Sequence, residues 1–245
     1  MTESDNITGD ASSDRVTNGS VTKANAKNNT GLAELYRDTR VRLCALVSGL
    51  EDAAHSAAVP ACPGWAVRDV IAHLTAIVED ALAGRLAGVP DEEFTAGQIA
   101  RMAGVPVAEM LNRWAAGAPQ FEDAIQAFEI WPAVIDVATH EQDVRGAIGR
   151  PGARDCAVIK RCTPMLLDWL APPVPVRIGT EDGDQVVGSG DDPELTLSTT
   201  RFEAFRWRMG RRSQAQLAAM DWSADPAPVL GELSVFGPAP TDIIE

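Results

Sequence analysis

The sequence predicts a mainly α-helical protein with an N-terminal four-helix bundle and a small α+β C-terminal domain. Apolar residues recur at helical spacing from Leu32 to Leu170. Three prolines, at positions 172, 173 and 175, then form a stiff joint. After this joint the apolar pattern alternates, which is typical of strands. The expected divisions are a disordered tail over residues 1–30, the bundle over 31–170 and the α+β domain over 171–245.

The N-terminal tail is rich in Ser, Thr, Asn, Asp and Lys, and it almost lacks large apolar side chains. Such a segment cannot bury enough surface to offset the entropy lost on ordering. We therefore expect residues 1–30 to be disordered.

Four main helices with short connections predict an antiparallel bundle. Two breaks interrupt the pattern: the turn Val59–Gly64, and a looser region over Gly88–Gly104 whose acidic cluster caps a helix start. Gly117 and Pro119 have low helix propensity and are expected to weaken the third helix. The expected helices are Leu32–Leu50, Trp65–Ala87, Val107–Phe128 and Pro132–Ile148, with a further helical stretch over Arg154–Leu170.

The C-terminal region mixes short strands and short helices. Asp182-Gly183 is a hairpin turn signal, Thr200 can cap a helix, and Ser213 with Gln216 forms a capping box. The expected strands are Val174–Thr180, Gln185–Gly188 and Glu194–Ser198, and a last helix is expected near Ala227–Leu233.

Composition excludes several classes of function. The net charge of -14 argues against a nucleic-acid partner and against docking on anionic lipid. No apolar run reaches the roughly 18 residues of a membrane span, and no signal peptide is evident. The four cysteines lack a C-x-x-C pair, which is typical of reduced core thiols. We therefore expect a cytoplasmic protein, and the acidity does not indicate which small molecule is its substrate.

The segment Trp131–Pro151 contains the strongest chemical signal. Asp136 and His140 are four residues apart, so on a helix they lie on the same face. A carboxylate and an imidazole placed this way can hold a divalent metal. Val137 and Val144 flank His140 at helical spacing, which turns its ring inward. Because a buried imidazole without a partner is costly, we interpret His140 as a metal ligand.

His73 is the second inward-facing histidine. It lies between Val70 and Ile77 on the apolar side of its helix. Considered alone, it is more simply a core histidine bonded to a carbonyl or an acid. The chain has three histidines, however, and His55 is expected to be solvated. Two inward histidines out of three favour a shared site.

His73, Asp136 and His140 match a three-ligand metal site with one position open for water or substrate. Zinc suits this ligand set best, although nickel, iron or manganese would accept it. The sequence contains no nucleophile elbow, phosphate-binding loop or dinucleotide fingerprint. Cys62, which precedes Pro63-Gly64, is interpreted as structural.

A cluster of arginines occurs within twelve residues of this acidic chain. For most of them we expect a solvated helix face paired with the acidic loop Glu181–Asp192. Arg211 follows Gly210 at a helix break, where its guanidinium can contact a substrate carboxylate in a bidentate manner. The cluster comprises Arg201, Arg206, Arg208, Arg211 and Arg212.

Three motifs, in order, resemble the mycothiol-dependent maleylpyruvate isomerase family, which belongs to the DinB-like group of metal-binding helical bundles. They are CPGWAVRDVIAHL at 62–74, DVATHEQDVRGAIGRP at 136–151 and MGRRSQAQLAAMDWSADPAPVLGELSVFGP at 209–238. The resemblance extends from about Gly31 to the C-terminus. It implies a DinB-like four-helix bundle holding zinc and a smaller C-terminal domain.

The resemblance also implies site residues and chemistry. His73, Asp136 and His140 match the family's metal ligands, and Arg211 matches an arginine that holds substrate carboxylate. The characterised isomerase, which this sequence resembles, has Glu at the position that matches Asp136. Asp136 therefore departs from the family pattern. In the family, the metal holds the thiolate of mycothiol, which adds to the cis double bond of maleylpyruvate. Rotation about the resulting single bond and expulsion of the thiol give fumarylpyruvate.

Two hypotheses about function follow. The first is a metal-dependent enzyme that uses mycothiol, as an isomerase or as a thiol S-transferase. The alternative is a non-catalytic bundle that binds metal or a small ligand for sensing or interaction, because fold and ligands do not fix function. The sequence does not indicate the oligomeric state.

Overall fold

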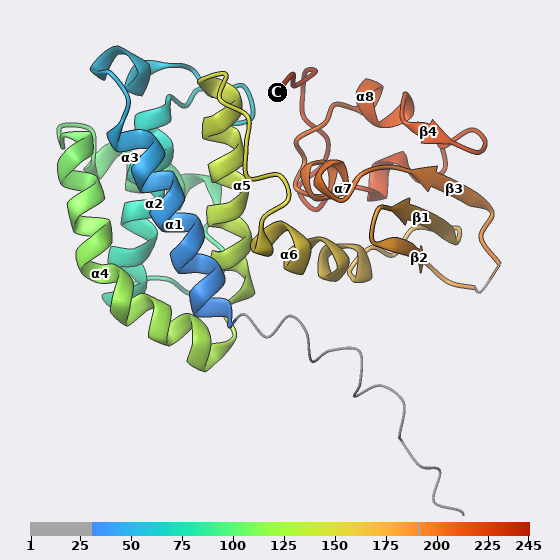
Figure 1. Ribbon diagram of the computed structural model, residues 1–245, viewed down its shortest axis with the longest axis horizontal. Coiled ribbons are helices and arrows are strands. Elements are labelled where there is room, and N and C mark those ends of the chain that lie inside the picture. The colour runs from blue at the N-terminus through green and yellow to red at the C-terminus, as the bar shows by residue number, and fades with distance from the viewer. Residues whose placement is uncertain (1–30, 191) are drawn as a thin grey trace, which may run out of the picture. The chain divides into compact units, whose positions relative to one another are not determined.

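The computed structural model describes residues 31–190 and 192–245 (Figure 1). The expected disorder of residues 1–30 lies outside this range. Gly31–Glu245 forms one compact unit. The unit is mainly helical with a small four-stranded sheet, as the sequence predicts.

Four long helices lie side by side in the first half of the unit (Figure 1). Each of the four helices buries the apolar residues on one side. The two helices that carry His73 and His140 are buried at most of their positions. Tyr36, Trp114 and Phe121 contribute large aromatic side chains to this core. The helices are α1 (Leu32–Ser48), α2 (Val67–Leu82), α4 (Val107–Phe128) and α5 (Trp131–Ala147).

The expected loose region contains a helix, α3 (Glu92–Arg101). Asp91 begins it as an N-cap, and its side chain accepts a hydrogen bond of 2.8 Å from the Phe94 backbone N–H. The side chain of Gln98 points inward and is fully buried. Because glutamine is polar, this position adds no apolar residue to the periodic pattern from which a helix is predicted. The helix start predicted at the acidic cluster is therefore confirmed, whereas the looser structure expected after it was wrong.

Gly117 does not weaken α4, which is continuous from Val107 to Phe128. A Cβ atom at Gly117 would lie 2.8 Å from Val78 Cγ1 on α2. Glycine therefore permits the close approach of α2 and α4, and α4 is as long as predicted.

The second half of the unit has its own apolar core, which includes Val176, Leu197 and Trp207. The sheet order is β2-β1-β3-β4, with β1 parallel to β3 and the other pairs antiparallel. Strand β4 is only two residues long and gave no sequence signal. The elements are α6 (Ala157–Asp168), β1 (Val176–Thr180), β2 (Gly183–Val187), β3 (Leu195–Ser198), α7 (Arg201–Arg208), α8 (Gln214–Ala218) and β4 (Asp221–Trp222).

Local signals in this half are confirmed. The hairpin joins Thr180 to Gly183. Thr200 accepts a hydrogen bond of 3.1 Å from the Glu203 N–H at the start of α7. Ser213 and Gln216 make the predicted capping box at α8, with hydrogen bonds of 3.0 and 3.1 Å. Two short 3-10 turns complete the elements: η2 (Asp52–Ser56), in the first half, and η3 (Leu230–Glu232). The helix expected near Ala227–Leu233 is thus present only as the turn η3.

The arginine cluster is mostly buried rather than solvated. Arg201 does pair with the acidic loop, through Glu181 and Asp182. Arg206 and Arg208, however, are 0% and 3% exposed, so the prediction of a solvated face was wrong for them. Arg208 donates to the backbone oxygens of Leu166 and Leu233, and burial lowers its pKa to about 10.

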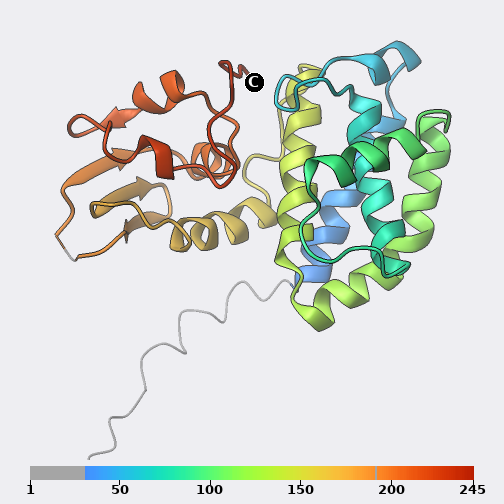
Figure 2. The same cartoon turned by 180° about the vertical axis from the view of Figure 1, so that it is seen from behind.

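The end of the chain lies beside α5 in both views (Figure 2). A Cβ atom at Gly146 would lie 3.3 Å from Glu245 Cγ. In the part of the chain that the structure describes, no helix has the length and apolar character needed to cross a membrane.

Candidate metal centre

The structure brings His73, Asp136 and His140 together. His73 lies on α2, and the other two residues lie one turn apart on α5. His73 Nε2 is 3.4 Å from one Asp136 oxygen, and His140 Nε2 is 3.4 Å from the other. Both histidines are 6% exposed, whereas a third of the Asp136 side chain is exposed. The three donors therefore form a buried cluster that opens on the carboxylate side.

The spacing of these donors allows them to share one metal ion. Each of the three residues offers a ligand atom within 4.8 Å of the other two. The two imidazole Nε2 atoms each lie 3.4 Å from an oxygen of the Asp136 carboxylate, one from each oxygen. Asp136, although one methylene shorter than Glu, reaches both imidazoles.

The charge of Asp136 also suits a cation. Burial raises the pKa of the Asp136 carboxyl, but the two imidazoles more than offset this and lower it below its ordinary value. The pKa of His73 is raised, because Asp136 and Gln98 outweigh the opposing effect of burial. Asp136 is therefore an ionised ligand at neutral pH.

Each imidazole is oriented by a partner on its outer nitrogen. His73 Nδ1 is 3.0 Å from Gln98 Oε1 on α3. His140 Nδ1 is 3.0 Å from Asp143 Oδ2, one turn along α5. When each Nδ1 carries the proton, Gln98 and Asp143 accept it and the Nε2 lone pairs face Asp136, which is the arrangement of metal-binding histidines.

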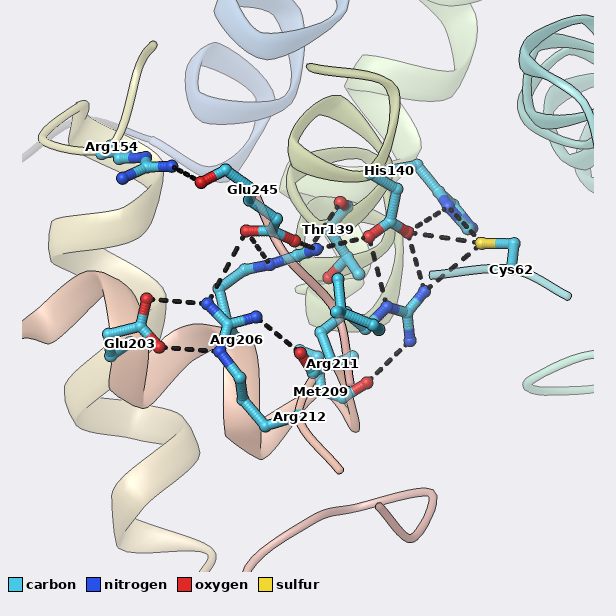
Figure 3. A network of polar contacts seen from close by, with 12 residues as sticks. Cys62, Thr139, His140, Arg154, Glu203, Arg206, Met209, Arg211, Arg212 and Glu245 are labelled. Carbon is cyan, nitrogen blue, oxygen red and sulfur yellow. Dashed lines mark hydrogen bonds and ion pairs between the residues drawn. The ribbon is translucent and has the colours of Figure 1, made fainter. Parts of the chain in front are cut away.

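Figure 3 shows a second, larger polar network that includes His140, Arg206 and Arg211. Asp143 pairs with all three of these residues. Its fully buried carboxylate is 2.8 Å from the guanidinium groups of both Arg206 and Arg211. Burial raises the pKa of Asp143, but these two arginines more than offset this and hold it well below its usual range. Arg206 also pairs with Glu245, so the chain's last residue is connected to the site through this network.

Cys62 contacts the same network. Its Sγ is 3.5 Å from Asp143 Oδ2 and 3.9 Å from His140 Nδ1, far closer than the sequence separation suggests. Burial raises the pKa of the Cys62 thiol. Cys62 is 9% exposed, so its thiol stays protonated and is a neutral hydrogen-bond donor in the wall of the site.

Cys62, His140 and Asp143 form a second group with donor atoms close enough to hold an ion. The two guanidinium groups on Asp143 disfavour a cation there, because like charges repel. In contrast, no arginine within the described range hydrogen-bonds to Asp136. The group of His73, Asp136 and His140 is therefore the better candidate.

Trp65 covers both imidazoles. Its ring centroid is 5.5 Å from that of His73 and 5.9 Å from that of His140. The turn that places it is closed by backbone hydrogen bonds from Val59 N to Trp65 O and from Trp65 N to Cys62 O. The turn predicted at Val59–Gly64 therefore forms one wall of the site.

Comparison with known proteins identifies the family. The model of the mycothiol maleylpyruvate isomerase N-terminal domain matches residues 36–158, half of the chain. The chain belongs to the mycothiol maleylpyruvate isomerase family. No curated protein sequence matches it.

Two solved structures share the family fold. The crystal structure of the mycothiol-dependent maleylpyruvate isomerase is 14% identical, with a TM-score of 0.50, over 74% of this chain and 88% of that chain. The crystal structure of a histidine-to-alanine mutant of the mycothiol-dependent maleylpyruvate isomerase is 12% identical, with a TM-score of 0.50, over 73% and 88%. At these identities the likeness establishes the fold of this family member.

Arg211 lies where a family site residue was expected, but its guanidinium is already engaged. Its Nε and Nη2 contact both oxygens of Asp143 at 3.3 and 2.8 Å. Its Nη1 donates to Met209 O at 2.7 Å, and Nη2 also contacts Cys62 Sγ at 3.8 Å. Four of its five N–H groups thus have partners. The bidentate partner of Arg211 in this structure is Asp143.

Several residues around the family site were missed from sequence. The spacing of His140 and Asp143 could have revealed that pair, since residues three apart on a helix are neighbours. Gln98, Arg206 and Glu245 gave no local signal, because each meets the site only through tertiary packing. His55, expected to be solvated, is half-buried, and its Nε2 is 3.3 Å from Val47 O.

Proposed function

We propose that this protein is a metal-dependent enzyme that uses a low-molecular-weight thiol, mycothiol, on a small electrophilic substrate. The reaction is an isomerisation of the maleylpyruvate type or a thiol S-transfer. The observation that supports the proposal most directly is the pair of buried imidazole Nε2 atoms, each 3.4 Å from the Asp136 carboxylate.

In this proposal His73, Asp136 and His140 hold one divalent metal, and zinc suits these donors. The bound metal would lower the pKa of a coordinated thiol and stabilise its anion. Trp65 excludes water from one side of the imidazoles. The exposed third of Asp136 marks the side from which thiol and substrate approach.

Arg211 is the residue that we propose to contact the substrate. One N–H of its Nη1 remains for a substrate carboxylate, and the Asp143 pair holds the guanidinium in place for that contact. This arrangement favours a single hydrogen bond to the substrate over the bidentate contact expected from sequence. The role given to Arg211 follows the family resemblance, and its position close to His140 and Cys62 supports it.

We also propose that the chain divides near residue 170 into a bundle and an α+β domain. Two apolar cores support this division, with Leu166 of α6 in the first core and Leu167 in the second. The metal ligands then come from one domain and Arg211 from the other. A cytoplasmic location is part of the proposal, and the four free cysteines are consistent with it.

Thiol-dependent turnover with and without metal tests the proposal. The chelated protein is assayed with mycothiol and either maleylpyruvate or a simple electrophile, before and after zinc is restored. We expect zinc-dependent turnover that His140→Ala abolishes. Zinc binding without any thiol-dependent reaction would instead favour a non-catalytic binding role.

A further inference from the structure

A chain of hydrogen bonds runs outward from His73 to a buried carboxylate. Gln98 on α3 bridges His73 and Asp80, which lies two turns beyond His73 on α2. Asp80 is in turn paired with Arg85 and Arg101. None of these partners touches the candidate metal position, yet together they determine which nitrogen of His73 can face it.

The first step is the state of Asp80. Its side chain is fully buried, and its Oδ1 accepts three hydrogen bonds of 2.6 to 2.8 Å from Arg85 and Arg101. Its Oδ2 accepts from Arg101 at 2.7 Å and from Gln98 Nε2 at 2.8 Å. Burial raises the pKa of Asp80, but Gln98 and the arginines more than offset this and lower it. An ionised carboxylate can only accept hydrogen bonds.

The second step is the orientation of the Gln98 amide. Since Asp80 only accepts, Gln98 must present its NH₂ group to Asp80 and its Oε1 to His73. The reversed amide would place its oxygen against a carboxylate oxygen inside a buried site, which is electrostatically unfavourable. The amide oxygen then accepts from His73 Nδ1 at 3.0 Å, which is shorter than the 3.4 Å between Nε2 and the competing acceptor, Asp136, so the geometry favours Nδ1 for the proton of the neutral ring.

We propose that Asp80 and Gln98 form a positioning relay that fixes the tautomer of His73 and directs its Nε2 lone pair toward Asp136. This inference rests on the proposed function, because the relay serves a purpose only if His73 binds a metal. The tautomer of His73, however, is a property of the metal-free protein. Hydrogen bonds to the outer nitrogen of a metal-binding histidine typically change metal affinity 10- to 100-fold.

A purely structural role for Asp80 is the competing explanation, and Glu122 provides a matched control. Glu122 on α4 is 2% exposed and is paired with Arg37 and Arg40 at 2.6 and 3.1 Å. It therefore resembles Asp80 in burial and in its two arginine partners. Within the described residues, Glu122 makes no hydrogen bond or ion pair with a histidine. We expect loss of its charge to disturb packing without changing the hydrogen bond to His73.

Asp80→Asn makes the sharpest test, because it should reverse the relay. The oxygen of the new amide takes the Oδ1 position, where three guanidinium contacts converge, and the amide NH₂ group then faces Gln98. Gln98 must turn its oxygen toward residue 80 and its NH₂ group toward His73 Nδ1. His73 would then carry its proton on Nε2, and the lone pair would face away from Asp136.

The measurement is the tautomer of His73 by long-range ¹H–¹⁵N NMR of the metal-free full chain, at a pH above the histidine titration range. Wild type and Glu122→Gln should show the proton on Nδ1, and Asp80→Asn should show it on Nε2. Zinc affinity, measured by competition with a chromogenic chelator, should fall about 10- to 100-fold in Asp80→Asn and stay within about threefold in Glu122→Gln.

Gln98→Met is the second variant, since it removes the acceptor while leaving Asp80 and its arginines in place. A mixture of His73 tautomers is expected in it. An unchanged Nδ1–H tautomer in both Asp80→Asn and Gln98→Met would overturn the relay, as would equal losses of zinc affinity in Asp80→Asn and Glu122→Gln. A wild-type protein that binds no zinc but shows the predicted tautomers would contradict the proposed function and leave the relay standing.

Discussion

Asp143 is the residue whose change should lower both the stability of the protein and its metal affinity. Its carboxylate has no exposed surface and pairs with Arg206 and Arg211 at 2.8 Å each. Asp143→Asn removes the charge and leaves the fully buried Arg206 with Glu245 as its one carboxylate partner among the described residues, beside the backbone oxygen of Thr139. Removing one partner of a buried ion pair typically costs 3–5 kcal/mol, and the remaining Glu245 favours a loss of about 3 kcal/mol. For a chain of this size, that corresponds to a melting temperature roughly 6–12 °C lower.

The same substitution should weaken the metal site. His140 loses the charged acceptor that lies 3.0 Å from its Nδ1, so we expect zinc affinity to fall about 10- to 100-fold. Differential scanning calorimetry of the metal-free protein gives the change in stability. Competition with a chromogenic chelator gives the change in affinity.

Glu141→Gln is the control for Asp143→Asn. Glu141 follows His140 on α5, is equally buried, and is paired with Arg42 and Arg145 at 2.8 and 2.9 Å. It makes no hydrogen bond or ion pair with either imidazole in the part of the chain described here. A comparable loss of stability with unchanged zinc affinity is expected. Equal zinc affinities in the two variants would refute the orienting role of Asp143.

Three further predictions concern the site itself. Asp136→Asn should lower zinc affinity at least about tenfold, because a neutral amide oxygen is a weaker zinc ligand than a carboxylate; an unchanged dissociation constant would remove Asp136 from the ligand set. Arg211→Ala should retain one zinc per chain yet lower kcat/KM at least about tenfold for a carboxylate substrate and not for a neutral electrophile; equal losses would contradict a carboxylate contact. Cobalt-substituted protein should give the intense visible absorption of tetrahedral Co²⁺, because three protein ligands and one open position make a four-coordinate site; weak octahedral bands would contradict this geometry.

The parts that sequence could predict are those with a local or periodic cause. The spacing of Asp136 and His140 places both on one face of α5, and the apolar residues around them fix which face is buried. His73 could be added because its flanking residues form an apolar stripe on α2. The long helices and the caps at Thr200 and Ser213 follow from equally local signals.

The parts that sequence could not predict depend on contacts between distant segments. Helix α3 was missed because its one fully buried residue is Gln98, which is polar and is satisfied by His73 and Asp80. Arg206 was expected in solvent because a lone guanidinium is costly to bury. Two carboxylates, from Asp143 and Glu245, compensate it, and neither is near it in the sequence.

The central claim is that His73, Asp136 and His140 hold one divalent metal. Zinc stoichiometry of the purified chain, measured by titration of the metal-free protein alongside His73→Ala and His140→Ala, tests it most directly. We predict one zinc per chain in the wild type and none in either variant at the same free zinc concentration. Full stoichiometry in both variants, or no zinc in the folded wild type, would contradict the claim.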